Sequence, residues 1–229
     1  MKKIAKMGEI SWAIGTFLCA FGVALCAKAD LGLSMVAAPA YILHVAISKV
    51  LPWYTHGTSE YIWQAFLLLL TCIIVKKFRP RYLLSFLSAF LSGLAIDLCL
   101  TILGGGGAYS ELWQRIVALA VGECCIALAV AFIFRTYFPV QVVELIVVET
   151  AGKYKLDTGK VKLFNDLISL ALSLVLAFTL TGGFEGVGVG TIVITFVNAP
   201  LIKLFGKLID KIFDFEPAFP NLRNFLLKI

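Results

Sequence analysis

The sequence predicts an all-α, polytopic membrane protein that forms a single membrane domain over residues 1–229. Hydrophobic residues make up 60% of the chain, charged residues make up only 15%, and the mean hydropathy is +0.95. This composition leaves too little polar surface to cover a soluble protein of 229 residues, so lipid must solvate much of the chain. The apolar residues also gather in runs near the ~20 residues that a helix needs to cross a bilayer.

Six of these runs are expected to be membrane-spanning helices. In chain order they cover residues 10–27, 61–75, 82–103, 112–134, 161–180 and 191–205. The second and the sixth are short, and each needs a flanking turn to reach across the hydrocarbon. The basic start MKKIAKMGEISW leads into the first run without a small-residue cleavage site, so we interpret that run as a retained helix and not as a signal peptide.

Two further apolar stretches are shorter or interrupted. Residues 34–51 contain a proline and a histidine, and residues 139–150 contain two glutamates, which are poor residues for a lipid-facing span. We expect two short re-entrant or interfacial helices there. Ser34 would be the N-cap of the first, and Pro139 would lie in the first turn of the second. The alternative for residues 34–51 is a seventh true span.

The distribution of basic residues predicts the orientation of the spans. With the N-terminus in the cytoplasm, every Lys and Arg except Lys28, Lys49 and Arg115 falls on the cytoplasmic side. This bias places both termini in the cytoplasm. The net charge of +6 then reflects topology and attraction to anionic lipid, and it indicates no nucleic-acid partner. Residues 206–229 are expected to form a cytoplasmic tail at the membrane surface.

The order of the expected elements repeats. A span, a short helix and two spans cover residues 10–103, and the same order covers residues 112–205. Because each unit crosses the membrane three times, the second unit enters from the opposite side, which predicts a 3+3 inverted repeat. Polar triplets in the last spans of the two units also correspond: Ser85, Ser88 and Ser92 in the first, and Thr191, Thr195 and Asn198 in the second.

A glycine-rich stretch, TGGFEGVGVGT at residues 181–191, marks the expected site. Its backbone can bend or admit a close neighbour within the membrane. The hinge or close-contact glycines are expected to be Gly32, Gly182, Gly186, Gly188 and Gly190. Thr191, Thr195 and Asn198 follow on one helical face and either contact a polar ligand or join the last span to its neighbours. The spacing of the glycines also suits simple helix packing.

Two carboxylates inside the spans are the clearest chemical candidates. Glu123 lies near the middle of its span, where a charged group costs at least ~2.5 kcal/mol, so it should face protein or water. It is either a proton-coupling or substrate-contacting acid, or a neutral group bonded to another helix. For Asp97 we favour interhelical hydrogen bonding over a direct functional role. Ser34, Ser88 and Ser92 complete the set of candidate binding residues.

The sequence favours no metal site, cofactor or enzyme activity. The six cysteines lie singly or as a Cys-Cys pair in apolar runs, without a CxxC motif, and His44 and His56 are far apart in the chain. The glycines from Gly104 to Gly107 lack the GK[ST] of a phosphate-binding loop, and no GxSxG or HExxH motif occurs.

Two segments carry a resemblance to a known family. AKADLGLSMVAAPAYIL at residues 27–43 and GVGVGTIVITFVNAPLIKLF at residues 186–205 are similar, in order, to the two conserved segments of the YczE/YyaS/YitT group of bacterial membrane proteins. Met35 and Ala199 depart from that pattern. The resemblance implies a multi-pass protein of the bacterial cytoplasmic membrane and implies no particular substrate.

Two functions fit these observations. The first is a secondary transporter of a small polar solute, anionic or zwitterionic, bound at the repeat interface where the short helices direct their N-termini. The second is a non-transporting membrane module that binds a partner protein or lipid. The bilayer is the expected surrounding in both cases, and no pattern predicts an oligomeric state.

Overall fold

The computed structural model describes residues 8–105 and 107–228, and all regular elements in these ranges are helices. Six helices are long and apolar enough to cross a membrane, which confirms the predicted number of spans. They are α1 (Gly8–Ala29), α3 (His56–Val75), α4 (Arg81–Ile102), α5 (Leu112–Ile133), α7 (Thr158–Leu176), which continues as the π-helical turn η1 (Ala177–Thr181), and α8 (Val189–Ile212). The shorter helices are α2 (Ala38–Ile47), α6 (Val142–Tyr154) and α9 (Pro220–Lys228).

The predicted starts of the two short helices were wrong by a few residues. Ser34 is not the N-cap of α2, because its carbonyl closes a separate turn with the N–H groups of Ala37 and Ala38, and Pro39 occupies the first helical turn. Pro139 precedes α6, which begins at Val142 after an extended residue. The start of α3 was also predicted too late, since Thr55 caps this helix by accepting a hydrogen bond from the N–H of Thr58.

The helices α1 and α5 form the central packed pair. They cross where Gly22 faces Gly122, and a Cβ atom on Gly22 would lie 2.6 Å from the carbonyl oxygen of Gly122. Gly15 packs farther along the same seam against Ala129 and Ile133. Small residues at these positions let the two backbones approach closely, as in other membrane helix pairs. The helix α4 packs against α1, and α8 packs against α5.

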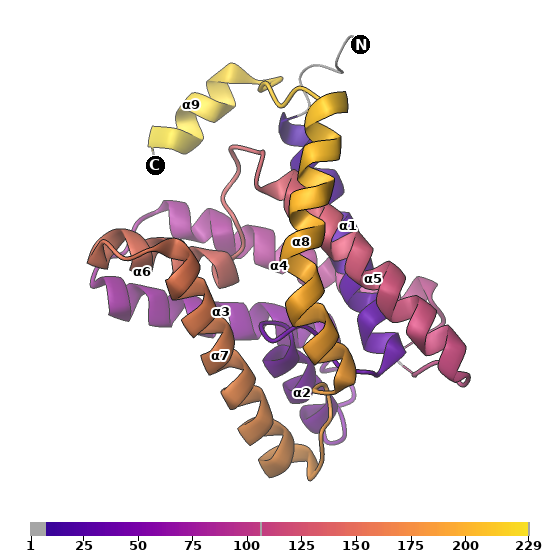
Figure 1. The fold of residues 1–229 in the computed structure, drawn as a ribbon. Coiled ribbons are helices and arrows are strands. Elements are labelled where there is room, and N and C mark those ends of the chain that lie inside the picture. Colours follow the sequence, from indigo (N-terminus) through magenta and orange to yellow (C-terminus); the bar gives the residue numbers. More distant parts are fainter. Residues whose placement is uncertain (1–7, 106, 229) are drawn as a thin grey trace.

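The remaining helices form a second group. The helices α3 and α4 lie side by side at the Gly57–Gly93 contact, α6 packs on α3, and α2 and α6 each contact α7. Figure 1 shows α1, α5 and α8 on one side of the molecule and α3, α6 and α7 on the other. The helices α7 and α8 come close near the loop that joins them and diverge toward their other ends (Figure 1).

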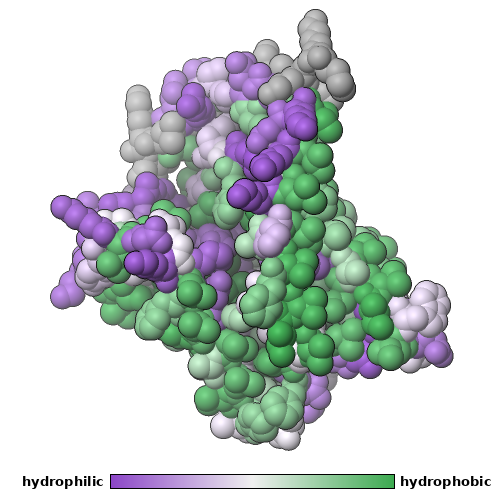
Figure 2. All heavy atoms as spheres, in the orientation of Figure 1, coloured by the Kyte–Doolittle hydropathy of each residue, from purple (hydrophilic) through white to green (hydrophobic). Residues whose placement is uncertain are grey.

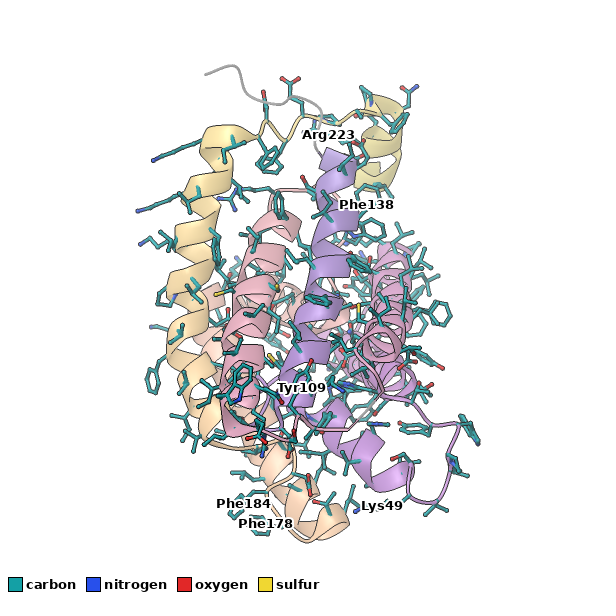
Figure 3. The ribbon with its side chains drawn as sticks, turned by 90° about the vertical axis from the view of Figure 1, so that its right-hand side faces the viewer. Lys49, Tyr109, Phe138, Phe178, Phe184 and Arg223 are labelled. Atoms are coloured by element: carbon teal, nitrogen blue, oxygen red, sulfur yellow. The ribbon has the colours of Figure 1, made fainter. Side chains whose placement is uncertain are left out.

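Both ends of the described chain lie at the same end of the molecule (Figure 1). There the Glu9 carboxylate accepts hydrogen bonds from the Tyr137 hydroxyl and from the N–H groups of Ala218 and Phe219. Figure 3 shows Arg223 of α9 at this end, opposite Lys49, Phe178 and Phe184. The C-terminal segment is therefore attached to the start of α1.

The outer surface of the long helices is largely apolar. Exposed large hydrophobic side chains occur on all six of them, for example Phe17, Leu69, Leu98, Phe164 and Phe196. In Figure 2 these faces are green, and hydrophilic residues gather at the upper end and in a hollow beside α8. This distribution is the one expected of a multi-pass membrane protein, with lipid around the helices and polar groups inside or at the ends.

Candidate functional site

The hollow beside α8 contains a cavity of about 280 Å³. It lies between the group formed by α1, α5 and α8 and the group formed by α3, α6 and α7. One wall is mainly apolar and comes from α1, α5 and α8, with Thr195 and Asn198 of α8 as its polar side chains. The opposite wall carries the charged side chains and Gln141. A concave, mostly apolar space with a few convergent polar groups is the usual form of a small-molecule site.

Both short helices begin at this cavity. The residues before α2, from Ser34 to Ala37, and the residues before α6, Val140 and Gln141, contribute to its lining. Neither helix has a side-chain hydrogen bond at its N-cap. The N-terminus of a helix carries a partial positive charge and N–H groups without intrahelical partners, so both helix ends favour a negatively charged group in the cavity.

A buried carboxylate lies on the polar wall. Glu60 is 8% exposed, and its Oε1 accepts a hydrogen bond of 2.8 Å from Nε2 of Gln64. The Gln64 amide in turn accepts from the N–H of Val142, at 3.0 Å, and lies 3.4 Å from Oε1 of Gln141. Gln64 thus joins α3 to the start of α6. Within the described residues, Oε2 of Glu60 has no hydrogen-bond partner.

A second polar group lies farther along the same wall. Nζ of Lys162 is 3.0 Å from Oε1 of Glu144 and 3.8 Å from Oδ1 of Asp166. All three side chains line the cavity together with Glu60. Among the described lining residues, three carboxylates therefore face one ammonium group, so the side chains favour a cationic group whereas the helix ends favour an anionic one.

Some of the predicted site residues are brought together here. Ser34, Thr195 and Asn198 line the cavity. Glu123 lies behind Asn198, which is its polar neighbour on α8, and is 5% exposed. Neither carboxyl oxygen of Glu123 makes a hydrogen bond of good geometry to the described part of the chain. Asn198 thus contacts both the cavity and the buried acid.

The predicted glycines join two segments that are distant in the sequence. The N–H of Leu33 donates to the carbonyl of Gly186 at 3.0 Å, and the N–H of Gly190 donates to the carbonyl of Leu31 at 2.7 Å. Gly188 also lies against Leu31. The loop before α2 and the loop before α8 are therefore paired through their backbones.

Other predicted residues take structural positions. The Oγ1 of Thr191 accepts from the N–H of Gly188 at the start of α8, and Gly182 ends η1 with a positive φ of 74°. Asp97 accepts hydrogen bonds from the N–H of Gly57, at 2.8 Å, and from the hydroxyl of Thr55, at 2.6 Å. It therefore caps α3 from α4, which is the interhelical role favoured from the sequence.

The serines of α4 lie outside the cavity lining. Ser88 and Ser92 are both 3% exposed, and the Ser88 hydroxyl donates to the carbonyl of Leu84 in its own helix. The structure thus separates the serine triplet of α4 from the polar residues of α8 that line the site.

Sequence reasoning missed most of the polar wall. The missed residues are Glu60, Gln64, Gln141, Glu144, Lys162 and Asp166. Two spacings carried a signal, because Glu60 and Gln64, and likewise Lys162 and Asp166, are four residues apart and share a helical face. Both pairs lie at the ends of the expected spans, residues 61–75 and 161–180, where polar side chains can reach water and do not by themselves indicate a site.

A second cavity, also of about 280 Å³, lies between α2 and the start of α3. Tyr41, His44, Lys49 and His56 contribute to it, and the two imidazole rings are stacked with their centroids 5.8 Å apart. Nδ1 of His44 lies 3.0 Å from the carbonyl oxygen of Tyr54. No group of three metal-ligating side chains occurs among the residues that the structure describes.

Comparison with known proteins supports the predicted resemblance. A family model described as "Family of unknown function (DUF6198)" matches residues 7–207. The uncharacterized protein YyaS of Bacillus subtilis (strain 168) is 26% identical over 210 residues, which cover 90% of this chain and 96% of that protein. The similarity to YyaS confirms the expected relationship to the YyaS-type group. No solved structure matches the chain.

Proposed function

We propose that this chain, which belongs to the DUF6198 family of unknown function, is a secondary transporter of a small polar solute and not an enzyme. It acts in the bacterial cytoplasmic membrane with both termini in the cytoplasm. The observation that carries the proposal is the cavity in which both short helices begin, between two groups of helices. Short helix ends that meet at a central site are a recurring feature of secondary transporters.

An inverted repeat of residues 10–103 and 112–205 supports this proposal. The packing of α1 on α4 corresponds to that of α5 on α8, and the packing of α2 on α3 corresponds to that of α6 on α7. The contacts of α3 with α6 and of α7 with α2 correspond in the same way, and α1 and α5 face each other. In this arrangement α2 and α6 are re-entrant helices that reach the site from opposite sides.

The two units differ in how their last two spans pack, and this difference suits alternating access. The helices α3 and α4 pack along the Gly57–Gly93 contact, whereas α7 and α8 diverge. We infer that the group of α1, α5 and α8 rocks against the other group. The paired loops at Leu31–Leu33 and Gly186–Gly190 act as the hinge, since their contact is made by glycines and backbone hydrogen bonds.

The charges of the site favour a zwitterionic solute over a purely anionic one. The helix ends bind its negative group, and the carboxylates of Glu60, Glu144 and Asp166 balance its positive group. Glu123 is the proton-coupling group. The Asn198 side chain connects it to the cavity, because Asn198 contacts Glu123 and also lines the cavity.

A ligand screen followed by a flux assay tests the function. Purified protein is heated with members of a library of polar metabolites at two pH values, and any stabilising compound is then offered to proteoliposomes that carry a pH gradient. A solute at one hundred times its Kd stabilises the folded state by about 2.7 kcal/mol. We expect pH-dependent uptake that is lost in Glu123→Gln and kept in the exposed-tail control Glu216→Gln.

The opposite result favours the second function. If no library member stabilises the protein and Glu123→Gln only lowers its melting temperature, the chain is a membrane module that binds a partner protein or lipid.

A further inference from the structure

We propose that the cavity binds a solute in which a protonated amine is joined to an apolar body, with the amine on Glu60 and the body against α5 and α8. The inference deepens the proposed function by specifying the positive group and the body of the zwitterionic solute, and it rests on that proposal in that this solute would be the transported one. It assigns a ligand class and a binding residue that neither the sequence nor the family comparison provides.

The first step concerns the open hydrogen-bonding position of Glu60. Its side chain is 92% buried and lines the cavity, Oε1 accepts from Gln64, and Oε2 has no partner among the described residues. A buried carboxylate that lacks a donor is costly, and a ligand ammonium offers three N–H donors and the opposite charge. An amine bound at Oε2 therefore satisfies a group that the protein leaves open.

The neighbouring side chains do not already fill this role. The Gln64 amide is engaged by the N–H of Val142 and by Gln141, so it is held on the Oε1 side of Glu60. The lining lysine, Lys162, makes its ion pairs with Glu144 and Asp166. The cation that balances Glu60 must consequently come from the ligand, or the carboxyl must carry a proton.

The second step concerns the opposite wall, which is mainly hydrocarbon apart from Thr195 and Asn198. It consists mainly of branched aliphatic side chains on α1, α5 and α8: Val23, Ile126, Val130, Ile133, Ile194 and Ile202. A fully hydrophilic solute would leave this surface facing water or a vacant space. A solute with an apolar body covers it, and the burial of apolar area supplies binding free energy.

The third step concerns access to the cavity. Lys162 and Asp166 of α7 lie on one side of it, and Asn198 and Ile202 of α8 lie on the other. The hollow in Figure 2 lies between these diverging helices, which are also the least buried of the spans. An amphipathic amine that partitions into the bilayer can enter from this side.

Three probes of similar size test the proposal. They are 2-phenylethylamine, which is a cation at neutral pH, 2-phenylethanol, which is neutral, and 3-phenylpropanoate, which is an anion. Their Kd values are measured with purified full-length protein in detergent. We expect the amine to bind more tightly than either of the other two, because only the amine brings N–H donors and a positive charge to Glu60.

Variants of one side chain separate binding from folding. We expect Glu60→Gln to weaken the amine about tenfold or more and to remove its advantage over the alcohol, since a charge-assisted hydrogen bond is lost. Glu60→Asp keeps the charge and is expected to retain the preference for the amine. The exposed-tail variant Glu216→Gln serves as the matched control and should bind like the unmodified protein. If Glu60→Gln does not fold, the inference is tested by whether the unmodified protein and Glu60→Asp both bind the amine more tightly than the alcohol and the anion.

Two results overturn the inference: equal affinity for the amine and the anion in the unmodified protein, or an unchanged amine affinity in folded Glu60→Gln. The test is independent of transport, because it is an equilibrium measurement in detergent. Amine binding without uptake by any proteoliposome preparation would leave this inference standing and would contradict the transporter proposal.

Discussion

Gly32 shows at the scale of one residue why the site needs glycine. Its φ of +107° lies in a region that side-chain-bearing residues rarely adopt, and an added Cβ would lie 2.6 Å from the backbone nitrogen of Gly188. The same contact brings the loops before α2 and α8 together. The conformation and the close approach act together, so no other residue type fits there without displacement of the partner loop.

We therefore expect Gly32→Ala to lower the free energy of unfolding by about 2 kcal/mol or more, because backbone strain and overpacking are combined. Gly183→Ala is the matched control, since Gly183 has ordinary φ and nothing within 4 Å of the added carbon. Thermal unfolding in detergent measures both. Equal melting temperatures for the two variants would mean that the loop pairing contributes little to stability.

Glu123 could be predicted as a site residue from the sequence and Glu60 could not, for a physical reason. A single carboxyl in the middle of a long apolar run can be recognised by its cost in lipid. Glu60 precedes the apolar run of α3 in sequence, and only the cap at Thr55 extends the helix back to His56. Only part of the cost of burying Glu60 is met inside the protein, by the hydrogen bond from Gln64, which the contact with α6 holds in place. Local patterns do not contain that information.

At the scale of the helices, α1 and α5 form the most extensive pair in the core. The α-carbon of Gly22 faces the carbonyl oxygen of Gly122, and the reverse also holds, so a methyl group on either glycine pushes the two backbones apart. The six spans themselves were predictable, because each is a long apolar run. Their partners were not, since lipid is as apolar as leucine and many small-residue faces are equally suited to packing.

We expect Gly22→Ala and Gly122→Ala each to destabilise the protein by about 1–3 kcal/mol through overpacking. The double variant should cost less than the sum of the two, because both methyl groups displace the same pair of helices. A double-mutant cycle of unfolding free energies measures this coupling. Strict additivity would indicate that the two glycines do not share one contact.

A buried glutamate joins α6 to the start of α4 and to the residues just before it, because two more exposed arginines contact its carboxylate. Glu149 is 6% exposed, whereas Arg79 and Arg81, which both contact its carboxylate, are 37% and 43% exposed. Removing both arginines leaves a buried charge and should cost about 3–5 kcal/mol. Glu149→Gln leaves two guanidinium groups that water can reach, and should cost about 1 kcal/mol.

The free energy of unfolding is measured for the double variant Arg79→Ala/Arg81→Ala and for Glu149→Gln under the same conditions. We expect the larger loss in the double variant. Glu149 is one of the two glutamates in the second short apolar stretch, residues 139–150, so the result also decides whether it is a structural anchor. A larger loss in Glu149→Gln than in the double variant would contradict the burial argument.

For the whole molecule, the membrane topology can be tested directly. With both termini in the cytoplasm and α2 re-entrant, the exposed Trp53 after α2 lies outside and the exposed Lys155 after α6 lies inside. In a cysteine-free background, Trp53→Cys should react with an impermeant maleimide in intact cells, and Lys155→Cys should react only after permeabilisation. The reverse pattern would support α2 as a seventh crossing.

The way in which the two groups of helices pack together could not be predicted from the sequence. The inverted repeat expected from the sequence would not have predicted the divergence of α7 from α8, because this divergence depends on the packing of the helices against one another. The polar wall is assembled from α3, α6 and α7, and α3 is separated from the other two in sequence by α4 and α5. The residues of this wall could therefore not be predicted without the positions of the helices in the fold.

The pairing of Leu31–Leu33 with Gly186–Gly190 also sets an order for biosynthesis. The ribosome completes the second partner roughly 150 residues after the first, which takes on the order of ten seconds or more. Until then the turn before α2 cannot form these two hydrogen bonds, although bilayer hydrocarbon offers no substitute for them. The first half of the chain therefore cannot complete its fold when it leaves the translocon, and the last span is the segment that closes it.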